Sequence, residues 1–237
     1  MKRFNEIAHI YDAQIPEHIR LHLLDKKTRA MQRVLSAARA TMGGQGTPKG
    51  LDIGCGTGWH VKRMCEMGFN VVGLDIAQRQ LECARVNAAA NRFAAANVLG
   101  LPFADATFDF AYAINVIHHI HLSRDQQAAL AEIARVLRPG GMFFLHEINT
   151  LNPAIRFYMD YLFPRMRHID DGRETWIMPT DLSNAPGFEL AAVEQFTFIP
   201  DFAPRPLFWL MRPFEAALER TCLRKYGAHF VAILRRV

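Results

Sequence analysis

The sequence predicts an α/β fold with a mostly parallel, doubly wound sheet. Between residues 49 and 149, short apolar stretches alternate with helical patterns of roughly 12–15 residues, which is typical of strand–helix–strand units. A glycine-rich turn, Gly54–Gly58, follows the first apolar stretch and opens a helical pattern. The 237 residues are enough for one such domain with a large core and additional segments.

Composition narrows the class of protein. Half of the residues are hydrophobic, yet no apolar run approaches the ~18 residues needed to span a bilayer, and the polar N-terminus has no signal-peptide core. The four cysteines form no CxxC pair and no metal-ligand spacing. We therefore expect free thiols, no metal site and a cytoplasmic location.

The net charge of +5 is concentrated in the first 50 residues, which hold nine Lys/Arg against four Asp/Glu. A basic helical arm is compatible with nucleic acid or an anionic membrane. No Lys/Arg block is sustained, however, and no aromatic–basic RNA motif is present. We expect a solvated helix face and no nucleic-acid partner.

Residues 1–48 are predicted to be helical and to precede the sheet. A short helix over residues 4–8 leads into Tyr11-Asp12, and apolar residues recur at helical spacing over 16–40. The glycine-rich stretch 41–48 then breaks the pattern. These helices are an addition to the α/β core, either a lid over a ligand cleft or a cover for one sheet edge.

The stretch Leu51-Asp52-Ile53-Gly54-Cys55-Gly56-Thr57-Gly58 predicts a buried strand, a tight turn and a helix over about 59–67. Glycines at alternate positions let a ligand approach the main chain, and the first N–H groups of the helix favour a carboxylate. The acid before the turn would repel a pyrophosphate and attract an ammonium group. The G-x-G-x-G spacing thus favours a ligand with both groups, such as S-adenosylmethionine (SAM), over a dinucleotide. The alternative is an ordinary strand-to-helix turn.

The second predicted strand, residues 70–76, ends in an acid that suits a ribose. Asp75 can accept both hydroxyls of a ribose bound across the first two strands. After a weak third strand at 92–96, Asn97 is placed to hydrogen-bond the adenine edge, and Ile76 to pack on the adenine face. For either of these last two residues, the alternative is a plain loop or core position.

The rest of the chain predicts four more strands and the helices between them. In chain order, the expected elements are a helix at 77–91, a strand at 108–114, a helix at 123–137 capped by Ser123, a strand at 142–148, helices near 153–163 and 179–185, a strand at 188–199, a helix near 213–223 and a strand at 228–234. Ligands of open α/β sheets bind outside the carboxyl ends of the strands, so we expect residues 115–121 to border the site.

Five motifs in order resemble those of the class I SAM-dependent methyltransferases, within the small-molecule, type 11-like group. They are the glycine motif at 51–58, Asp75, Leu101-Pro102-Phe103 with Phe108-Asp109, Val116-Ile117-His118-His119, and Leu137-Arg138-Pro139-Gly140-Gly141. The Tyr11-Asp12 pair is also similar to the N-terminal motif of the family. The resemblance covers about residues 4–150.

The resemblance implies a fold and a division of the chain. The fold is a Rossmann-like seven-stranded, mostly parallel, doubly wound sheet of order 3-2-1-4-5-7-6, with strand 7 antiparallel and helical insertions before strand 6 and between strands 6 and 7. The chain would be a single class I methyltransferase domain over 1–237. In it, 1–48 form an N-terminal helical lid, 49–150 the SAM-binding core, and 151–237 the substrate-side insertions with strands 6 and 7.

The resemblance also implies a site for SAM and its product S-adenosyl-L-homocysteine (SAH). Asp52 and the glycine turn would hold the methionine part, Asp75 the ribose, and Tyr11 would close over the carboxylate. Asn97 stands where the family usually has an aspartate, although an amide oxygen also accepts a hydrogen bond. The expected cofactor-binding residues are Tyr11, Asp52, Gly54, Cys55, Gly56, Gly58, Asp75, Ile76, Asn97, Val98 and Asn115.

A hydroxyl acceptor must lose a proton, and histidine is the usual base near neutral pH. We expect His119 or His146 in that role, then His118; His121 also lies nearby, and Glu147 is an orienting partner. The alternatives are a structural histidine pair, or catalysis by positioning alone when the acceptor is already nucleophilic.

The acceptor pocket is expected between the N-terminal helices, residues 150–187 and residues 200–226. The last 87 residues hold 14 of the 25 aromatic residues, so we expect a small, partly apolar or aromatic acceptor, methylated at oxygen. Alternatives are a carbon, nitrogen or lipid acceptor, or a non-catalytic SAM-binding or assembly protein. The apolar stretch 202–214 carries two arginines. Three roles are open for it: a peripheral membrane contact, the interface of a homodimer, or the core of a lid in a monomer.

Overall fold

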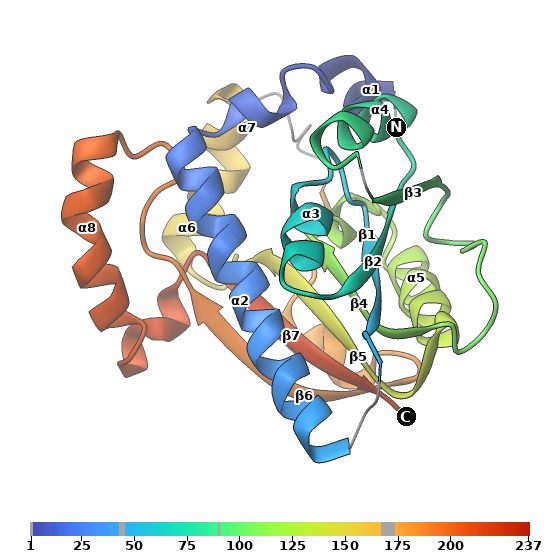
Figure 1. The fold of residues 1–237 in the computed structure, drawn as a ribbon. Helices are drawn as coiled ribbons and strands as arrows, with labels where there is room; N and C mark the ends of the chain where they lie inside the picture. Colours follow the sequence, from blue (N-terminus) through green and yellow to red (C-terminus); the bar gives the residue numbers. More distant parts are fainter. Residues whose placement is uncertain (1, 43–45, 90, 167–173) are drawn as a thin grey trace.

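A seven-stranded sheet forms the centre of the computed structural model, which describes residues 2–42, 46–89, 91–166 and 174–237 (Figure 1). The strand order is β3-β2-β1-β4-β5-β7-β6. The strands are β1 (Lys49–Ile53), β2 (Asn70–Asp75), β3 (Arg92–Ala95), β4 (Phe108–Ile114), β5 (Leu137–Ile148), β6 (Phe188–Phe196) and β7 (His229–Arg236). β7 pairs antiparallel with β5 and β6, and the other pairs are parallel. The Rossmann-like order and the antiparallel last strand are confirmed.

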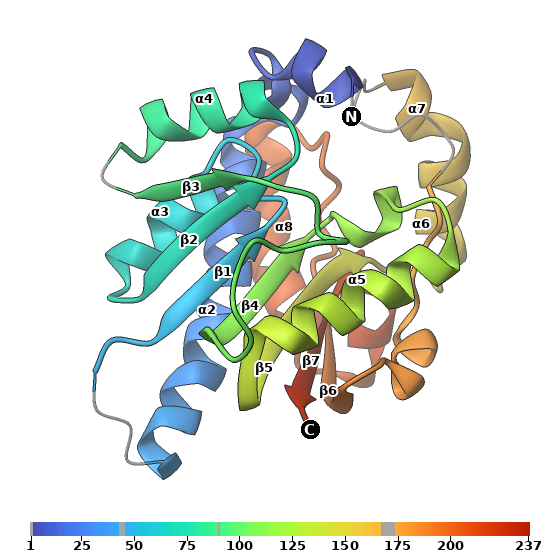
Figure 2. The same ribbon diagram turned by 90° about the vertical axis from the view of Figure 1, so that its right-hand side faces the viewer.

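Helices cover both faces of the sheet, which explains why its central strands are apolar on both sides. One apolar layer lies under α5 and includes Leu51, Leu130 and Phe143; the other lies under the helices of the opposite face and includes Met31 and Phe144. Figure 2 shows α5 on one side of the sheet and α2 and α3 on the other. These helices are α2 (Glu17–Met42), α3 (Trp59–Glu66), α4 (Gln78–Asn87) and α5 (Ser123–Val136).

The N-terminal segment is tied to the glycine turn by one carboxylate. The segment consists of α1 (Lys2–Ile7), the 3-10 turn η1 (Tyr11–Gln14) and α2. Asp12 accepts hydrogen bonds from Thr57 Oγ1 at 2.9 Å and from Trp59 Nε1 at 2.7 Å. Nearer the N-terminus, Asn5 Oδ1 accepts a hydrogen bond from the backbone N–H of Arg79, at the start of α4. The segment therefore lies on the carboxyl ends of the first strands, in addition to covering one sheet face.

Helical insertions lie before β6 and between β6 and β7, as expected. Before β6 are α6 (Pro153–Phe157), the π-helical turn η3 (Tyr158–Leu162), α7 (Phe163–Met166) and η4 (Pro179–Asn184); between β6 and β7 are α8 (Arg205–Leu218) and η5 (Cys222–Tyr226). A further short helix, η2 (Ile117–His119), follows β4. Among the helices of the described ranges, none is both long and apolar enough to cross a bilayer.

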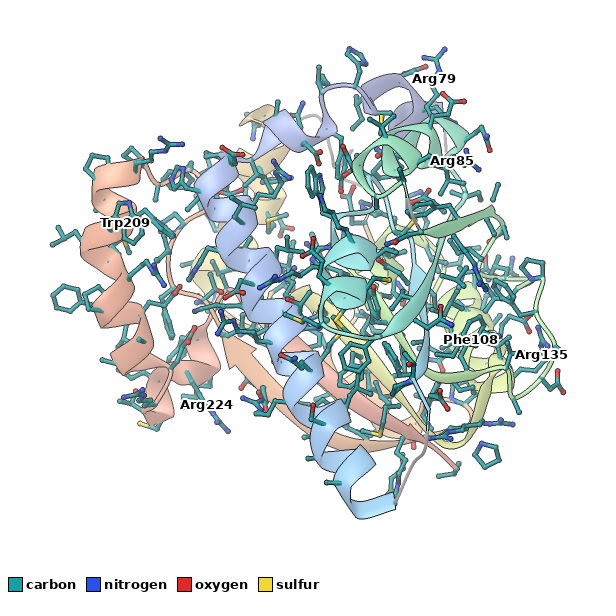
Figure 3. The ribbon with its side chains drawn as sticks, viewed as in Figure 1. Arg79, Arg85, Phe108, Arg135, Trp209 and Arg224 are labelled. Atoms are coloured by element: carbon teal, nitrogen blue, oxygen red, sulfur yellow. The ribbon has the colours of Figure 1, made fainter. Side chains whose placement is uncertain are left out.

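The helix between β6 and β7 begins earlier than the sequence predicted. Pro213 was expected in its first turn, but α8 starts at Arg205, with Pro206 in that place and Pro213 inside the helix. The first N–H groups of a helix have no partner within the helix, so proline, which has no N–H, is tolerated there. This explains why α8 begins beside Pro206. Phe208 lies before Pro213 and Glu215 after it, and both side chains are buried. Their packing stabilises the helix on either side of the internal proline. Figure 3 shows Trp209 on this helix, at the outer edge of the molecule.

Three smaller boundaries also differ from the prediction. Ser123 is the first residue of α5 rather than its cap, because its side chain caps no backbone N–H. β5 begins at Leu137, since that residue already pairs with β4. β6 ends at Phe196 rather than 199, because Thr197 has a positive φ of 71° that a strand cannot contain.

Candidate cofactor and acceptor site

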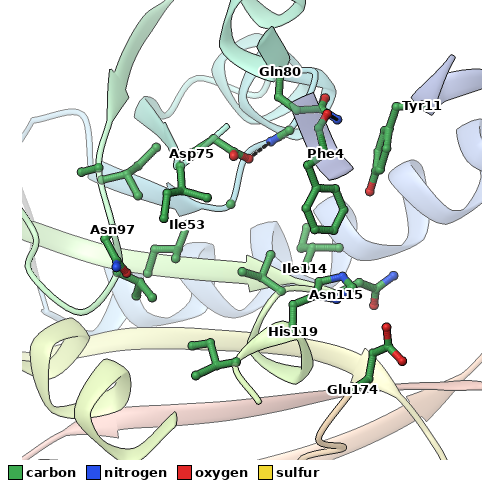
Figure 4. A pocket seen from close by; sticks show the side chains of 18 of the residues that line it. Phe4, Tyr11, Ile53, Asp75, Gln80, Asn97, Ile114, Asn115, His119 and Glu174 are labelled. Carbon is green, nitrogen blue, oxygen red and sulfur yellow. Dashed lines mark hydrogen bonds between the residues drawn. The ribbon is translucent and has the colours of Figure 1, made fainter. Parts of the chain in front are cut away.

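A cavity of about 380 Å³, called here the first cavity, lies at the carboxyl ends of β1, β2 and β4. In Figure 4, Asp75 and Asn97 lie toward one end of it, and Tyr11, Asn115 and Glu174 toward the other. Of the expected cofactor residues, those that line it are Tyr11, Gly54, Gly56, Asp75, Ile76, Asn97, Val98 and Asn115. Asp52, Cys55 and Gly58 do not. Sequence reasoning missed Phe4, Gln80 and Glu174 in its wall, since no local motif marks them.

The three glycines of the turn have different structural roles. All have positive φ, but a Cβ on Gly54 would lie 2.5 Å from Val116 Cγ2, and one on Gly58 would lie 2.9 Å from Ala84 Cβ. A Cβ on Gly56 would meet only Gln80 Oε1, at 4.0 Å. Gly54 and Gly58 are thus required by packing, while Gly56 presents its backbone to the open first cavity.

Alanine substitutions should separate these roles. Gly54→Ala is expected to lower the free energy of unfolding by about 2–4 kcal/mol, because it adds a clash to a strained φ. Gly56→Ala has only the φ of 52° to accommodate, which costs about 1 kcal/mol, and should instead weaken ligand binding in the first cavity. Urea denaturation measures the first quantity. Equal destabilisation by the two variants would contradict this assignment.

Asp75 is placed by the turn itself. Its Oδ2 accepts from the Gly56 N–H at 2.9 Å, and its Oδ1 accepts from the Ala77 N–H at 2.8 Å. Burial raises the pKa of the Asp75 carboxyl, and the backbone donors partly offset that rise by favouring the charged form. Asp75 lines the first cavity, and a carboxylate has more acceptor sites than these two backbone donors use, so it can accept further hydrogen bonds there.

Asp52 does not belong to the cavity wall. Its side chain is 2% exposed and lies in the layer opposite to that of Ile53, next to Tyr112 of the neighbouring strand. Successive side chains of a strand point to opposite faces, and here the cavity has Ile53 on its side. Burial raises the pKa of the Asp52 carboxyl well above its usual value, and the charge of Asp75 adds to the rise. A contact between Asp52 and an ammonium group stays a prediction.

A second cavity, also of about 380 Å³, adjoins the first. Most of its wall comes from three segments far apart in sequence, the start of α2, the α6–η3–α7 segment and residues 197–202, and the loop after β4 contributes further residues. Most of its lining is aliphatic or aromatic. One polar pair stands in the wall, where the Tyr158 hydroxyl donates to Asp201 Oδ1 at 2.7 Å. The second cavity thus suits a small apolar or aromatic molecule.

Three residues, Tyr11, Asn115 and His119, line both cavities. Asn115 has a positive φ of 55°, and its Oδ1 is buried with no hydrogen-bond partner among the described residues. A non-glycine residue in that conformation is strained by about 1–3 kcal/mol, and such strain is typical of functional sites. Molecules in the two cavities would therefore meet at these three side chains.

The expected histidines occupy different environments. His118 is buried, lines the second cavity, and has its Nδ1 2.6 Å from Glu147 Oε2. Glu147 Oε1 accepts from the Ile117 N–H at 3.0 Å, so the carboxylate is fixed and holds the proton of His118 on Nδ1. The His119 ring lies beside it at 4.1 Å between ring centroids, tilted by 48°, and His121 lines the first cavity.

His146 lies apart from both cavities. It is fully buried, and burial lowers its pKa well below the usual value; Lys27, whose own pKa burial lowers to about 8, adds to the effect. Neither ring nitrogen has a hydrogen-bond partner in the part of the chain that the structure describes. Its backbone oxygen accepts from the Asn115 N–H, so His146 supports the site from behind.

The wall of the second cavity is anchored by a buried acid on α8. Glu215 Oε1 accepts from the backbone N–H groups of Phe198 and Ile199 at 2.9 and 3.3 Å. Its Oε2 accepts from His22 Nε2 at 2.7 Å and Lys26 Nζ at 2.6 Å. One carboxylate thus holds α2, α8 and the cavity-lining residues together.

The pKa of Glu215 predicts a pH-dependent contribution to stability. Burial alone would raise it, but His22 and Lys26 outweigh burial and lower it from 4.5 to about 2. A lowered folded-state pKa stabilises the fold above the unfolded value, and this stabilisation is lost as pH falls from about 4.5 to about 2. We expect Glu215→Gln to cost about 3 kcal/mol at pH 7 and less at pH 3, as thermal denaturation would show. The same loss at both pH values would contradict the ionic role.

Among the described residues, no three His, Cys, Asp or Glu side chains converge as metal ligands would. The glycine turn, Asp75 and the histidine loop after β4 contribute residues to the lining of the first cavity.

Comparison with known proteins identifies the family. A family model described as a methyltransferase domain matches residues 51–145. A demethylmenaquinone methyltransferase of Renibacterium salmoninarum is 30% identical over 165 residues, which cover 68% of this chain and 67% of that protein. This chain belongs to the class I SAM-dependent methyltransferases. Family membership implies SAM as the methyl donor.

Other methyltransferases extend the comparison. The O-methyltransferase rstn1 of Aspergillus nomiae is 35% identical over 134 residues, which cover 51% of this chain and 58% of that protein. This chain thus spans little more than half of the fungal relative. A Thermotoga maritima structure, described as a possible histamine N-methyltransferase, covers 100% of this chain and 99% of its own with a TM-score of 0.65 at 19% identity. At that identity the likeness shows the fold alone.

The first cavity of this methyltransferase fits the family's donor. The Asp75 carboxylate, which can accept hydroxyl groups, lines the cavity, and Gly56 leaves the main chain open beside it. Asn97 Oδ1 accepts from the Leu99 N–H at 3.0 Å and keeps one lone pair. A Synechocystis magnesium protoporphyrin IX methyltransferase of the same fold, with a TM-score of 0.58 at 15% identity, was solved with bound SAH.

Proposed function

We propose that this chain transfers the methyl group of SAM to a hydroxyl oxygen of a small, partly apolar or aromatic acceptor. The observation that supports this is the pair of adjoining cavities. One carries the glycine turn and Asp75, the other is apolar, and they share Tyr11, Asn115 and His119. SAM in the first cavity supplies an electrophilic methyl group. The task of the protein is then to align an acceptor oxygen with it and to exclude water.

In this proposal, Asp75 accepts the ribose hydroxyls and Asn97 meets the adenine edge, with Ile76 and Val98 beside the ring. The backbone at Gly54 and Gly56 lies against the methionine part, which Tyr11 covers. Cys55 and Gly58 act indirectly, because Cys55 is buried in the core and Gly58 packs against α4. The acceptor lies between the start of α2, Tyr158 and residues 197–202.

We assign the proton transfer to His118. Among the three candidate bases, His118 both lines the second cavity and has its orientation fixed by a carboxylate, Glu147. That carboxylate also stabilises the imidazolium that forms when the ring takes a proton. His119 borders both cavities and is the second candidate. His146 reaches neither and has a lowered pKa, so we no longer place it in this role.

The names of the relatives favour oxygen as the target atom, since the first three are O-methyltransferases. Demethylmenaquinone methyltransferases match a longer part of the chain, 68–70% of it, and support a quinone-like acceptor as the second candidate.

Calorimetry with SAM and SAH tests the donor site, and turnover on a panel of phenols and hydroxyquinones tests the reaction. We expect micromolar binding of both ligands and methylated product from at least one phenol. Binding without any product across the panel would favour a non-catalytic SAM-binding protein. No binding of either ligand would overturn the proposal.

A further inference from the structure

The helix α8 presents apolar side chains to the outside and its acid to the inside. Phe208 and Glu215 are buried against the protein, whereas Trp209 is 61% exposed and Phe214 64% exposed. The usual surface helix has the opposite arrangement. With the neighbouring exposed phenylalanine before the helix, these side chains form what we call the outer apolar surface: Phe202, Leu207, Trp209, Leu210 and Phe214. Figure 3 shows Trp209 at the rim of the molecule that α8 forms.

The charged groups around this surface are mainly positive; an exposed acid, Glu17, has its Oε2 4.0 Å from Arg205 Nη2. Glu215 and Glu219 turn inward, where Lys26 Nζ lies 2.6 and 2.5 Å from their carboxylates. Arg212 lies over the Trp209 ring, 5.1 Å from its centroid, at the edge of the apolar side chains. The exposed cations of residues 205–226 are Arg205, Arg212, Arg220, Arg224 and Lys225.

We propose that the outer apolar surface docks on an anionic membrane. Aromatic and leucine side chains surrounded by arginine and lysine are what an interfacial helix uses to enter the headgroup region of an anionic bilayer. A second copy of this chain is a poorer occupant. A two-fold interface would bring the same cations of both copies together, and like charges repel.

The position of Phe202 links the membrane to the acceptor. Its side chain is 48% exposed in the outer apolar surface and also lines the second cavity. The ring of Tyr158, another wall residue of that cavity, lies 5.8 Å from the Phe202 ring. Resting on the proposed function, this places the acceptor cavity beside the bilayer, so acceptors that dissolve in lipid would reach it directly.

Vesicle flotation tests the docking without any acceptor. The full chain is mixed with vesicles of phosphatidylcholine alone or of phosphatidylcholine with phosphatidylglycerol. We expect binding to the anionic vesicles, and a decrease in that binding as salt is raised. Leu210→Ser with Phe214→Ser should lower the partition coefficient by roughly tenfold for each side chain. Val86→Ser with Leu122→Ser is the matched control, since both side chains are exposed away from α8, Val86 on α4 and Leu122 just before α5.

Charge-reversal variants complete the design. Arg212→Glu with Arg224→Glu should abolish the preference for anionic vesicles, whereas Arg124→Glu, on exposed α5, should leave it unchanged. Thermal denaturation checks that each variant is folded. Equal flotation of the wild type and the α8 variants would overturn the proposal. A second outcome would also overturn it: the wild type does not float, sediments as a dimer, and becomes a monomer in the α8 variants. The surface would then be a subunit interface. SAM calorimetry is expected to be unaffected by these variants, so a failure here is distinguishable from a failure of the proposed function.

Discussion

Asp75→Asn is expected to weaken SAM binding about 100-fold. The carboxylate is fixed by the Gly56 and Ala77 N–H groups and lines the first cavity. Two hydrogen bonds from ribose hydroxyls to a charged acceptor contribute about 3 kcal/mol together. An asparagine replaces one carboxylate oxygen by an NH₂ donor. That donor would face either a backbone N–H, which is also a donor, or a ribose hydroxyl, which would have to accept instead of donate.

Calorimetry with SAM and SAH measures this loss. The matched control is Asp105→Asn, because Asp105 is exposed and pairs with Arg135 outside both cavities. Since burial raises the pKa of Asp75 above its ordinary 3.8, SAM affinity should also begin to fall at a higher pH on the acid side than an exposed aspartate would cause. This acid limb should be missing in Asp75→Asn. An unchanged affinity in the variant would remove Asp75 from the donor site.

His118→Gln is expected to lower kcat by about 10²–10⁴-fold while SAM affinity stays within a factor of two or three. The ring lines the second cavity rather than the first, so its loss removes proton transfer and not donor binding. Glu147→Gln should have a smaller effect, about tenfold, because the amide still accepts from Nδ1 but no longer stabilises the imidazolium.

The measurement uses whichever phenol of the panel is turned over best. The pH profile of kcat separates a base from a structural residue, because the acid limb should disappear in His118→Gln and remain in the His9→Gln control, which is on the surface. If His119→Gln removes the limb and His118→Gln does not, the base is His119. If neither does, the acceptor is activated by position alone.

The sequence was sufficient for the parts of the molecule that local motifs define. The glycine turn, Asp75 and the loop after β4 are each marked by a short motif, and the fold brings all three to one sheet edge. It was not sufficient to predict which face of the sheet a given strand residue points to. Asp52 and His146 stand at the expected strand ends, but the pleat turns both into the core. A strand that is apolar on both faces gives no sign of which face borders a ligand.

The sequence placed the acceptor pocket among the right segments, the N-terminal helices, residues 150–187 and residues 200–226, but it could not give the individual wall residues of the second cavity. Most of its wall comes from the start of α2, the segment around Tyr158 and residues 197–202, which only the complete fold brings together. The anchor of that wall, Glu215, resembles an ordinary surface glutamate in the sequence. Nothing in the pattern of α8 shows that its acid is inside and its leucines outside, because Pro206 and Pro213 obscure where the helix starts.

Tyr11, Asn115 and His119 line both cavities, so a donor in the first cavity and an acceptor in the second, as proposed, would be energetically coupled. By thermodynamic reciprocity, whatever factor an acceptor adds to the affinity for SAM, SAM adds to the affinity for that acceptor. If that factor is favourable, each partner binds more tightly in the ternary complex than alone, and a dead-end complex of SAH with unreacted acceptor would show as inhibition at high acceptor concentration.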